Sequence, residues 1–248
     1  MTNRTEVIYS GSTAFGSYRI VDTVYNDRPA RVLYGDNDSP QSGRANDDNP
    51  ELLFDYNQRF LEIIESIRPK KVLVIGGSAC MLPIAAFNRL PDITIDIVEL
   101  DPLLGDLAYQ YFDAPRDDAF KIHFGDGLKF LRKKPRQYDM IIIDAFLGFT
   151  IPPHLYDEAA MRTYSQNLSK TGVVAMNFIG ELTGSQSGLT REVVASFRDS
   201  FSHVELYQAD PFFDKAAEQN FVVTASKSQI EFDYLQSTDI SHFVVMKI

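Results

Sequence analysis

The sequence predicts a doubly wound α/β fold, with a mostly parallel sheet and a small N-terminal antiparallel β unit. From Lys70 onward, apolar strand patterns alternate with helical patterns, which is typical of βαβ units. Four of these strands end at a glycine turn or at an acid. Before them, the chain alternates apolar and polar residues, as half-buried strands do. We therefore expect residues 1–48 to form the β unit and residues 49–248 the larger, Rossmann-like domain.

Each element has its own local signal. Segments 17–21 and 30–34 read as strands around the turn-like Tyr25–Pro29. An apolar stripe at helical spacing begins near Pro50 and ends at Pro69. A helix should start near Leu82-Pro83, where proline is tolerated in the first turn. Further helices are expected at 157–168 and 187–201, and further strands at 173–178, 204–207, 221–224 and, in the tail, 242–246.

Composition narrows the class of protein. The 248 residues are 44% hydrophobic, enough for a substantial core, and no run approaches the roughly 18 apolar residues of a membrane span. The N-terminus carries no apolar segment typical of a secretory signal, so we expect a cytoplasmic protein with no membrane partner. Cys80 is the only cysteine, which excludes an internal disulfide and suggests a buried thiol rather than a reactive one.

The net charge of −10 argues against a nucleic-acid partner, because phosphate binding needs a basic face and none is visible. A negative field favours cationic small molecules, although the acids could equally serve only solubility. The histidines, cysteine and acids show no metal-ligand spacing, so no metal is expected.

The four strand ends predict a ligand site. Strand 72–75 opens onto Gly76-Gly77, strand 95–98 ends at Glu99, strand 121–124 ends at Gly125-Asp126-Gly127, and strand 140–143 ends at Asp144. Ligands of open parallel sheets bind at the carboxyl ends of the strands, near the point where strand order reverses. We expect all four ends to face one crevice that binds a nucleoside. The glycine pattern is not G-x-G-x-x-G, which disfavours a dinucleotide.

Each acid has a functional and a structural interpretation. Glu99 follows Gly76 at the spacing of a ribose ligand, and Asp101-Pro102 already supplies the next helix cap, which leaves Glu99 available. Asp126 could accept from an adenine amino group or simply cap the helix after it. Asp144 could be a general base, an amine-binding group or a loop cap.

Two further segments are candidates for the acceptor pocket, whereas His123 is not. His154, on the proline-stiffened loop Ile151–Leu155, could assist proton removal or be an ordinary surface histidine. Phe212-Phe213, after Asp210-Pro211, could form a wall of the pocket or could pack in the core or in a lid, and Phe213 is the candidate site residue. His123 alternates with apolar neighbours and reads as a residue at the edge of the core.

The motifs taken in order resemble the spermidine synthase (polyamine aminopropyltransferase) family, which has the fold of class I S-adenosylmethionine-dependent methyltransferases. The resemblance covers roughly residues 15–226. The matching segments are Val72–Gly77, Val98–Asp101, Gly125–Gly127 and Tyr138–Asp144, together with the β-rich N-terminal region and the helix that carries Tyr56.

The resemblance implies a transferase of polyamine biosynthesis that binds decarboxylated S-adenosylmethionine, or S-adenosylmethionine, as co-substrate without a metal. Glu99 would hold the ribose, Asp126 the adenine amino group, and Asp144 would activate a small-molecule amine acceptor. The glycine turn, Leu100 and Gly127 would complete the nucleoside site, and Tyr56, His154 and Phe213 the acceptor pocket. A homodimer is also implied.

The chain departs from the family pattern at five positions. Ala79 stands where the family's glycine loop carries an acid for the cofactor's amine, and Leu147 stands where the strand-four motif carries a second Asp. Asn57-Gln58 replaces His-Glu or Gln-Glu after the helix tyrosine, and Gly16 replaces a glutamine. Losing the loop acid removes repulsion against a carboxylate, so intact S-adenosylmethionine becomes a candidate co-substrate. The alternatives to aminopropyl transfer are therefore a methyltransferase and a non-catalytic nucleoside-binding module.

Overall fold

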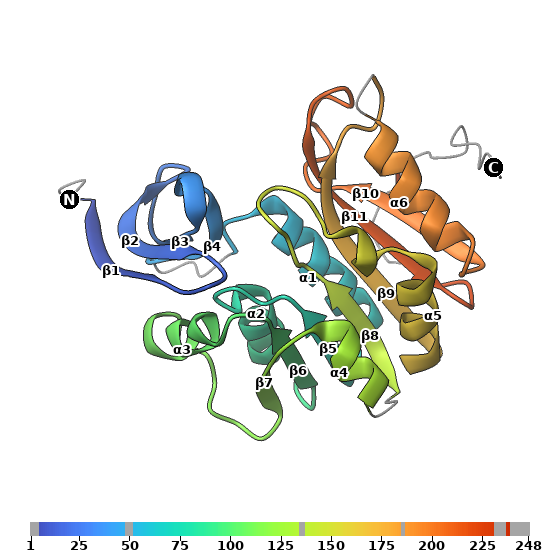
Figure 1. Ribbon diagram of the computed structural model, residues 1–248, viewed down its shortest axis with the longest axis horizontal. Helices are drawn as coiled ribbons and strands as arrows, with labels where there is room; N and C mark the ends of the chain where they lie inside the picture. The colour runs from blue at the N-terminus through green and yellow to red at the C-terminus, as the bar shows by residue number, and fades with distance from the viewer. Residues whose placement is uncertain (1–4, 48–51, 134–136, 185–186, 231–236, 239–248) are drawn as a thin grey trace.

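The computed structural model describes residues 5–47, 52–133, 137–184, 187–230 and 237–238, and it contains two sheets (Figure 1). The larger sheet has the strand order β10-β11-β9-β8-β5-β6-β7. Strands β5 to β9 are parallel, whereas β11 runs antiparallel to β9, and the edge strand β10 runs antiparallel to β11 and hence in the direction of the parallel strands. Strand order reverses between β5 and β8, as the doubly wound prediction requires. The strands are β5 (Lys71–Ile75), β6 (Thr94–Glu99), β7 (Phe120–Phe124), β8 (Tyr138–Ile143), β9 (Leu168–Gly180), β10 (His203–Gln208) and β11 (Gln219–Ser226).

In the described part of the chain, six α-helices cover the two faces of this sheet. One buried cluster contains side chains of α1, α2 and α3, and a second, on the opposite face, contains side chains of α4, α5 and α6. Helices on both faces explain why the central strands are apolar without alternation. The helices are α1 (Asp55–Ile67), α2 (Met81–Arg89), α3 (Pro102–Tyr111), α4 (Gly127–Lys133), α5 (Glu158–Asn167) and α6 (Gly188–Arg198).

The smaller sheet is an antiparallel meander whose order follows the chain. Asn26 and Asp27, with φ of 48° and 61°, form the tight turn between its second and third strands, as expected for a hairpin whose turn residues tolerate positive φ. The strands are β1 (Glu6–Ser12), β2 (Ser17–Tyr25), β3 (Arg28–Tyr34) and β4 (Pro40–Ala45), with a 3-10 turn, η1 (Asp36–Asp38), before β4.

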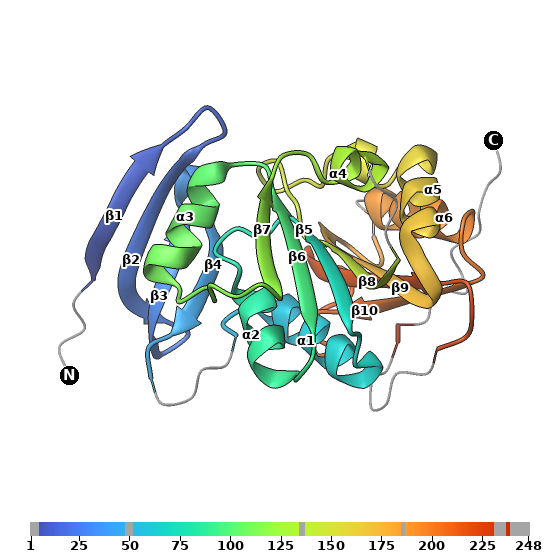
Figure 2. The ribbon, with the colours of Figure 1, turned by 90° about the horizontal axis from the view of Figure 1, so that it is seen from below.

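The smaller sheet packs against α2 and α3, at the edge of the larger one (Figure 2). Thr13 Oγ1 donates to Asp101 Oδ2 at 2.5 Å, and Arg31 Nη1 donates to the Tyr111 carbonyl at 3.1 Å. The rings of Tyr9 and Tyr111 also meet, with centroids 5.7 Å apart. These contacts hold the smaller sheet against both ends of α3, from its N-cap Asp101 to its last residue Tyr111.

Local predictions differ from the structure at a few places. The helix expected from Pro50 begins at Asp55, because Leu52 is drawn into a β-bridge with Arg44. The tail strand expected at 242–246 lies outside the described residues. Cys80 is buried as predicted, and burial raises the pKa of its thiol. Over the described ranges, none of the helices is both long and apolar enough to cross a bilayer.

Strand β8 carries a fully buried apolar run in the middle of the sheet, so it offers a test of the packing. Ile142→Ala should lower the free energy of unfolding by about 2–5 kcal/mol, because Ile142 is fully buried and truncation leaves a cavity. Denaturant unfolding monitored by circular dichroism measures the change. The matched control is Phe212→Ala, whose side chain is 96% exposed and should cost no more than about 0.5 kcal/mol. Equal losses in the two variants would contradict the assigned core.

Candidate active site

The glycine turn after β5 is set by close backbone contacts. Gly76 has a φ of 79°, and a Cβ at this position would lie 2.3 Å from the carbonyl oxygen of Asp144. A Cβ on Gly77 would lie 2.7 Å from Ile97 Cγ2. Any side chain would force the loop away from β6 and β8, so both positions require glycine. The turn therefore runs close against the two neighbouring strand ends.

Glu99 joins this turn to β6. Its Oε2 accepts from the backbone amides of Gly77 and Ser78 at 2.8 and 2.9 Å. Its Oε1 accepts from the amides of Leu100 and Asp101 at 2.7 and 3.2 Å. Glu99 is only 7% exposed, and burying a carboxylate costs desolvation free energy. The four amide donors compensate this cost.

The helix after Glu99 has its own cap, as the sequence suggested. Asp101 accepts from the Leu103 amide at 3.0 Å and begins α3. Glu99 is therefore spared from capping, but its carboxylate is occupied by loop amides, which sequence reasoning did not foresee. Two of these amides, those of Gly77 and Ser78, come from the glycine turn after β5, and only the folded strand order brings them close to Glu99.

Asp126 stands at the end of β7 and caps α4. Its Oδ1 accepts from the Lys129 amide at 2.7 Å, which is the structural interpretation considered from the sequence. Its Oδ2 lies 3.9 Å from His154 Nε2. Leu100 and Phe124, each 52% exposed, stand at the ends of β6 and β7. This exposed apolar pair next to a carboxylate offers a surface for a flat, amino-bearing ring.

Asp144 follows β8 directly and is held by both of its neighbouring strands. Its amide donates to the Ile75 carbonyl at 2.8 Å, and its Oδ1 accepts from Asn177 Nδ2 at 2.9 Å. Burial raises the pKa of the Asp144 carboxyl to about 6, and the charge of Glu99 adds to the rise, while the Asn177 hydrogen bond opposes it. A carboxyl with this pKa is ionised at neutral pH and still basic enough to take a proton.

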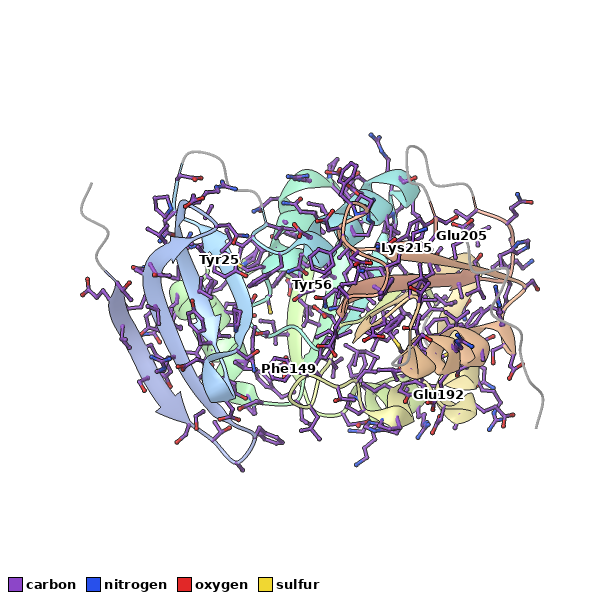
Figure 3. The ribbon with its side chains drawn as sticks, turned by 90° about the horizontal axis from the view of Figure 1, so that it is seen from above. Tyr25, Tyr56, Phe149, Glu192, Glu205 and Lys215 are labelled. Atoms are coloured by element: carbon purple, nitrogen blue, oxygen red, sulfur yellow. The ribbon has the colours of Figure 1, made fainter. Side chains whose placement is uncertain are left out.

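A narrow cleft joins Asp144 to the glycine turn and to the smaller sheet. Tyr56, labelled in Figure 3, lies between the two sheets and contributes to this cleft. Burial, and then the charge of Asp144, raise the pKa of the Tyr56 hydroxyl, so it stays a neutral phenol. The lining residues are Gln41, Ser42, Tyr56, Asn57, Val74, Gly76, Gly77, Ser78, Met81, Leu82, Pro83 and Asp144.

Two buried polar atoms in the cleft wall, Asn57 Oδ1 and Ser78 Oγ, have no hydrogen-bond partner among the described residues. Leaving such atoms unpaired is costly, so they mark places where a bound molecule would gain hydrogen bonds. Sequence reasoning missed Ser78 as a site residue, and it missed Gln41 and Ser42 from the smaller sheet. No local pattern identifies them, because their role depends on how the two sheets pack.

The remaining predicted site residues lie elsewhere. His154, in the 3-10 turn η2 (Pro153–Leu155), is 58% exposed and stands beside Asp126 rather than in the cleft. Phe213 lies in the connection between β10 and β11, where its carbonyl accepts from Gln208 Nε2 at 3.3 Å, and it does not line the cleft. Within the described ranges, no group of three or more His, Cys, Asp or Glu side chains is placed to hold a metal ion.

Two relatives each match about half of the chain. The polyamine aminopropyltransferase of Vibrio vulnificus (strain CMCP6) is 32% identical over 137 residues, which are 54% of this chain and 44% of the relative. The eEF1A lysine and N-terminal methyltransferase of Mus musculus is 29% identical over 141 residues, which are 53% of this chain and 18% of the relative. The chain thus spans less than half the length of each.

Solved structures share the fold. A probable spermidine synthase from Corynebacterium glutamicum ATCC 13032 superposes with a TM-score of 0.76 at 18% identity, covering 93% of this chain and 82% of the other. A spermidine synthase in complex with the transition state analogue AdoDATO gives a TM-score of 0.70 at 20% identity, covering 90% and 74%.

The family model for the spermine/spermidine synthase domain matches residues 60–232, which is more than half of the chain. The matched range runs from within α1 to beyond β11 and includes the glycine turn, Glu99, Asp126 and Asp144. This chain belongs to the spermine/spermidine synthase family.

Proposed function

We propose that this protein is a transferase that binds an S-adenosyl nucleoside and transfers an aminopropyl or related alkyl group to a small amine, with Asp144 as the general base. The observation that carries the proposal is Asp144 itself, a carboxyl with a pKa of about 6 in a cleft beside the glycine turn. The Vibrio relative is named an aminopropyltransferase, and one structural neighbour holds AdoDATO, which supports the same chemistry here.

The strand ends suit a nucleoside. We assign the ribose to Glu99, whose carboxylate is acceptor-only and already lies against the glycine turn. Ribose hydroxyls would join or replace the loop amides as donors to it. We assign the adenine amino group to Asp126 Oδ2, with Leu100 and Phe124 against the ring, while Oδ1 continues to cap α4. The unpaired Ser78 and Asn57 atoms give a bound ligand further partners.

Asp144 would act on the acceptor. Its carboxylate takes a proton from the acceptor's ammonium group, which frees the nitrogen lone pair. That lone pair attacks the carbon attached to the sulfonium, the carbon–sulfur bond breaks, and its electron pair stays on sulfur as a neutral thioether. In-line positioning and this single proton transfer are the main requirements of such a displacement. Tyr56 would form the wall beside the acceptor.

A methyltransferase is the second candidate, and two positions favour it. Ala79 is fully buried in the glycine loop and Leu147 is 77% exposed beyond β8, so neither position offers a carboxylate to hold a positive amine. A co-substrate that keeps its own carboxylate meets less repulsion in such a site. The mouse relative, a lysine and N-terminal methyltransferase, supports this candidate.

Calorimetric titration with S-adenosylmethionine, its decarboxylated form and methylthioadenosine tests the nucleoside site and separates the two candidates. Preference for the decarboxylated form favours aminopropyl transfer, and preference for intact S-adenosylmethionine favours methyl transfer.

Glu99→Gln should weaken the binding of the nucleoside by about 1.5–3 kcal/mol, the scale of hydrogen bonds to a charged group. The control is Asp106→Asn on the exposed face of α3, which should bind normally. Failure of all three ligands to bind would refute the nucleoside site.

The base assignment predicts a separate result. In Asp144→Asn, the new side chain has the same shape and the same neighbouring strands, but it cannot take a proton. The variant should therefore bind the nucleoside normally and lose turnover. In the unmodified protein, turnover should fall as the pH drops below about 6, because the carboxyl becomes protonated there. Product formation followed by mass spectrometry across that range measures both effects. Substantial turnover by Asp144→Asn would show that another group is the base.

A further inference from the structure

Two asparagine side chains continue the site from Asp144 across the sheet. Asn177 Nδ2 donates to Asp144 Oδ1 at 2.9 Å, and Asn220 Nδ2 donates to Asn177 Oδ1 at 2.9 Å. Asn177 is fully buried in β9, and Asn220 lies at the start of β11. The three residues thus form a directed chain of hydrogen bonds that ends at the carboxylate.

Strand register brings these side chains together. Ile143 of β8 pairs with Met176 of β9. The next residues on the two strands, Asp144 after β8 and Asn177 in β9, therefore lie side by side. Asn177 pairs in turn with Val222 of β11, and Asn220 lies two residues before Val222, on the same face of the sheet. A slip of one residue in either pairing would turn an asparagine to the other face. The chain of amides is therefore a product of the sheet and not of a flexible loop.

The direction of these hydrogen bonds follows from amide chemistry. An asparagine side chain has a donor end and an acceptor end, and an ionised carboxylate can only accept. Because Asn220 donates to the carbonyl oxygen of Asn177, the donor end of Asn177 is turned toward Asp144. Without Asn220, the buried carbonyl of Asn177 would lose its partner, and the amide could turn over and present an oxygen to the carboxylate.

We propose that Asn177 and Asn220 are positioning residues for the base: they hold Asp144 Oδ1 so that Oδ2 is left to take the acceptor's proton. This inference rests on the proposed function of Asp144. Oδ2 has no hydrogen-bond partner within the described part of the chain. The titratable groups whose charges act on Asp144 and its surroundings are Glu99 from β6 and Tyr56 from α1, neither of which is a cation. The amide chain thus stabilises the ionised base with neutral groups.

The ionisation of Asp144 can be measured without turnover, by carbon-13 NMR of its carboxyl carbon between about pH 4 and 8, with Asp144→Asn to assign the signal. Asn177→Leu, close in volume and without a donor, should raise the pKa by about one unit or more. Asn220→Leu leaves Asn177 in place, so it should also raise the pKa of Asp144, but by a smaller amount. In turnover assays, the acidic limb of kcat should move with these shifts while the Kd for the nucleoside stays unchanged.

Val222→Ala is the matched control, because Val222 is a buried neighbour on the same face of β11 with no polar group. It should lower stability and leave the Asp144 titration unchanged. An unshifted titration in Asn177→Leu, or a shift in Val222→Ala as large as that in Asn220→Leu, would overturn the proposal. If the unmodified protein binds no S-adenosyl nucleoside, the proposed function fails, and the NMR titrations still decide whether the amide chain controls Asp144.

Discussion

The site depends on one backbone contact, the close approach of Gly76 to the residue that follows β8. The Gly76 amide donates to the Val98 carbonyl at 2.9 Å, and the Asp144 amide donates to the Ile75 carbonyl at 2.8 Å. These bonds join the ends of β5, β6 and β8 where strand order reverses. Because the turn has no side chain, Glu99 and Asp144 stand close enough for the charge of one to raise the pKa of the other.

The two carboxylates differ because their surroundings differ. Glu99 receives four backbone amide donors, which compensate the burial of its carboxylate. Asp144 receives one side-chain donor, and its pKa is raised. Neighbouring acids whose environments are this unequal are suited to separate tasks, one to binding and the other to proton transfer. Both residues are acids at strand ends, but Glu99 accepts from four amides and Asp144 from one side chain, and burial raises the pKa of Asp144.

Patterns that depend on one short segment were predictable from the sequence. The strand ends, the Asp101 cap and the burial of Cys80 follow from apolar runs and capping residues. Features that depend on contacts between distant segments of the chain were not predictable from the sequence. The lone polar Asn177 in an apolar strand could have drawn attention, but Asn220 acquires its role only through the β9–β11 register. The start of α1 was also missed, because a bridge to β4 competes with the helix for Leu52.

The cleft has walls from two separate parts of the chain. Gln41 and Ser42 come from the smaller sheet, whereas Asp144 and the glycine turn come from the larger one. The contacts of Thr13 and Arg31 with the larger domain hold the two parts together without involving the cleft residues. Substitutions on β4 can therefore reshape one wall while the carboxylates keep their geometry. One wall of the cleft can thus vary in sequence independently of the strand ends that carry the acids.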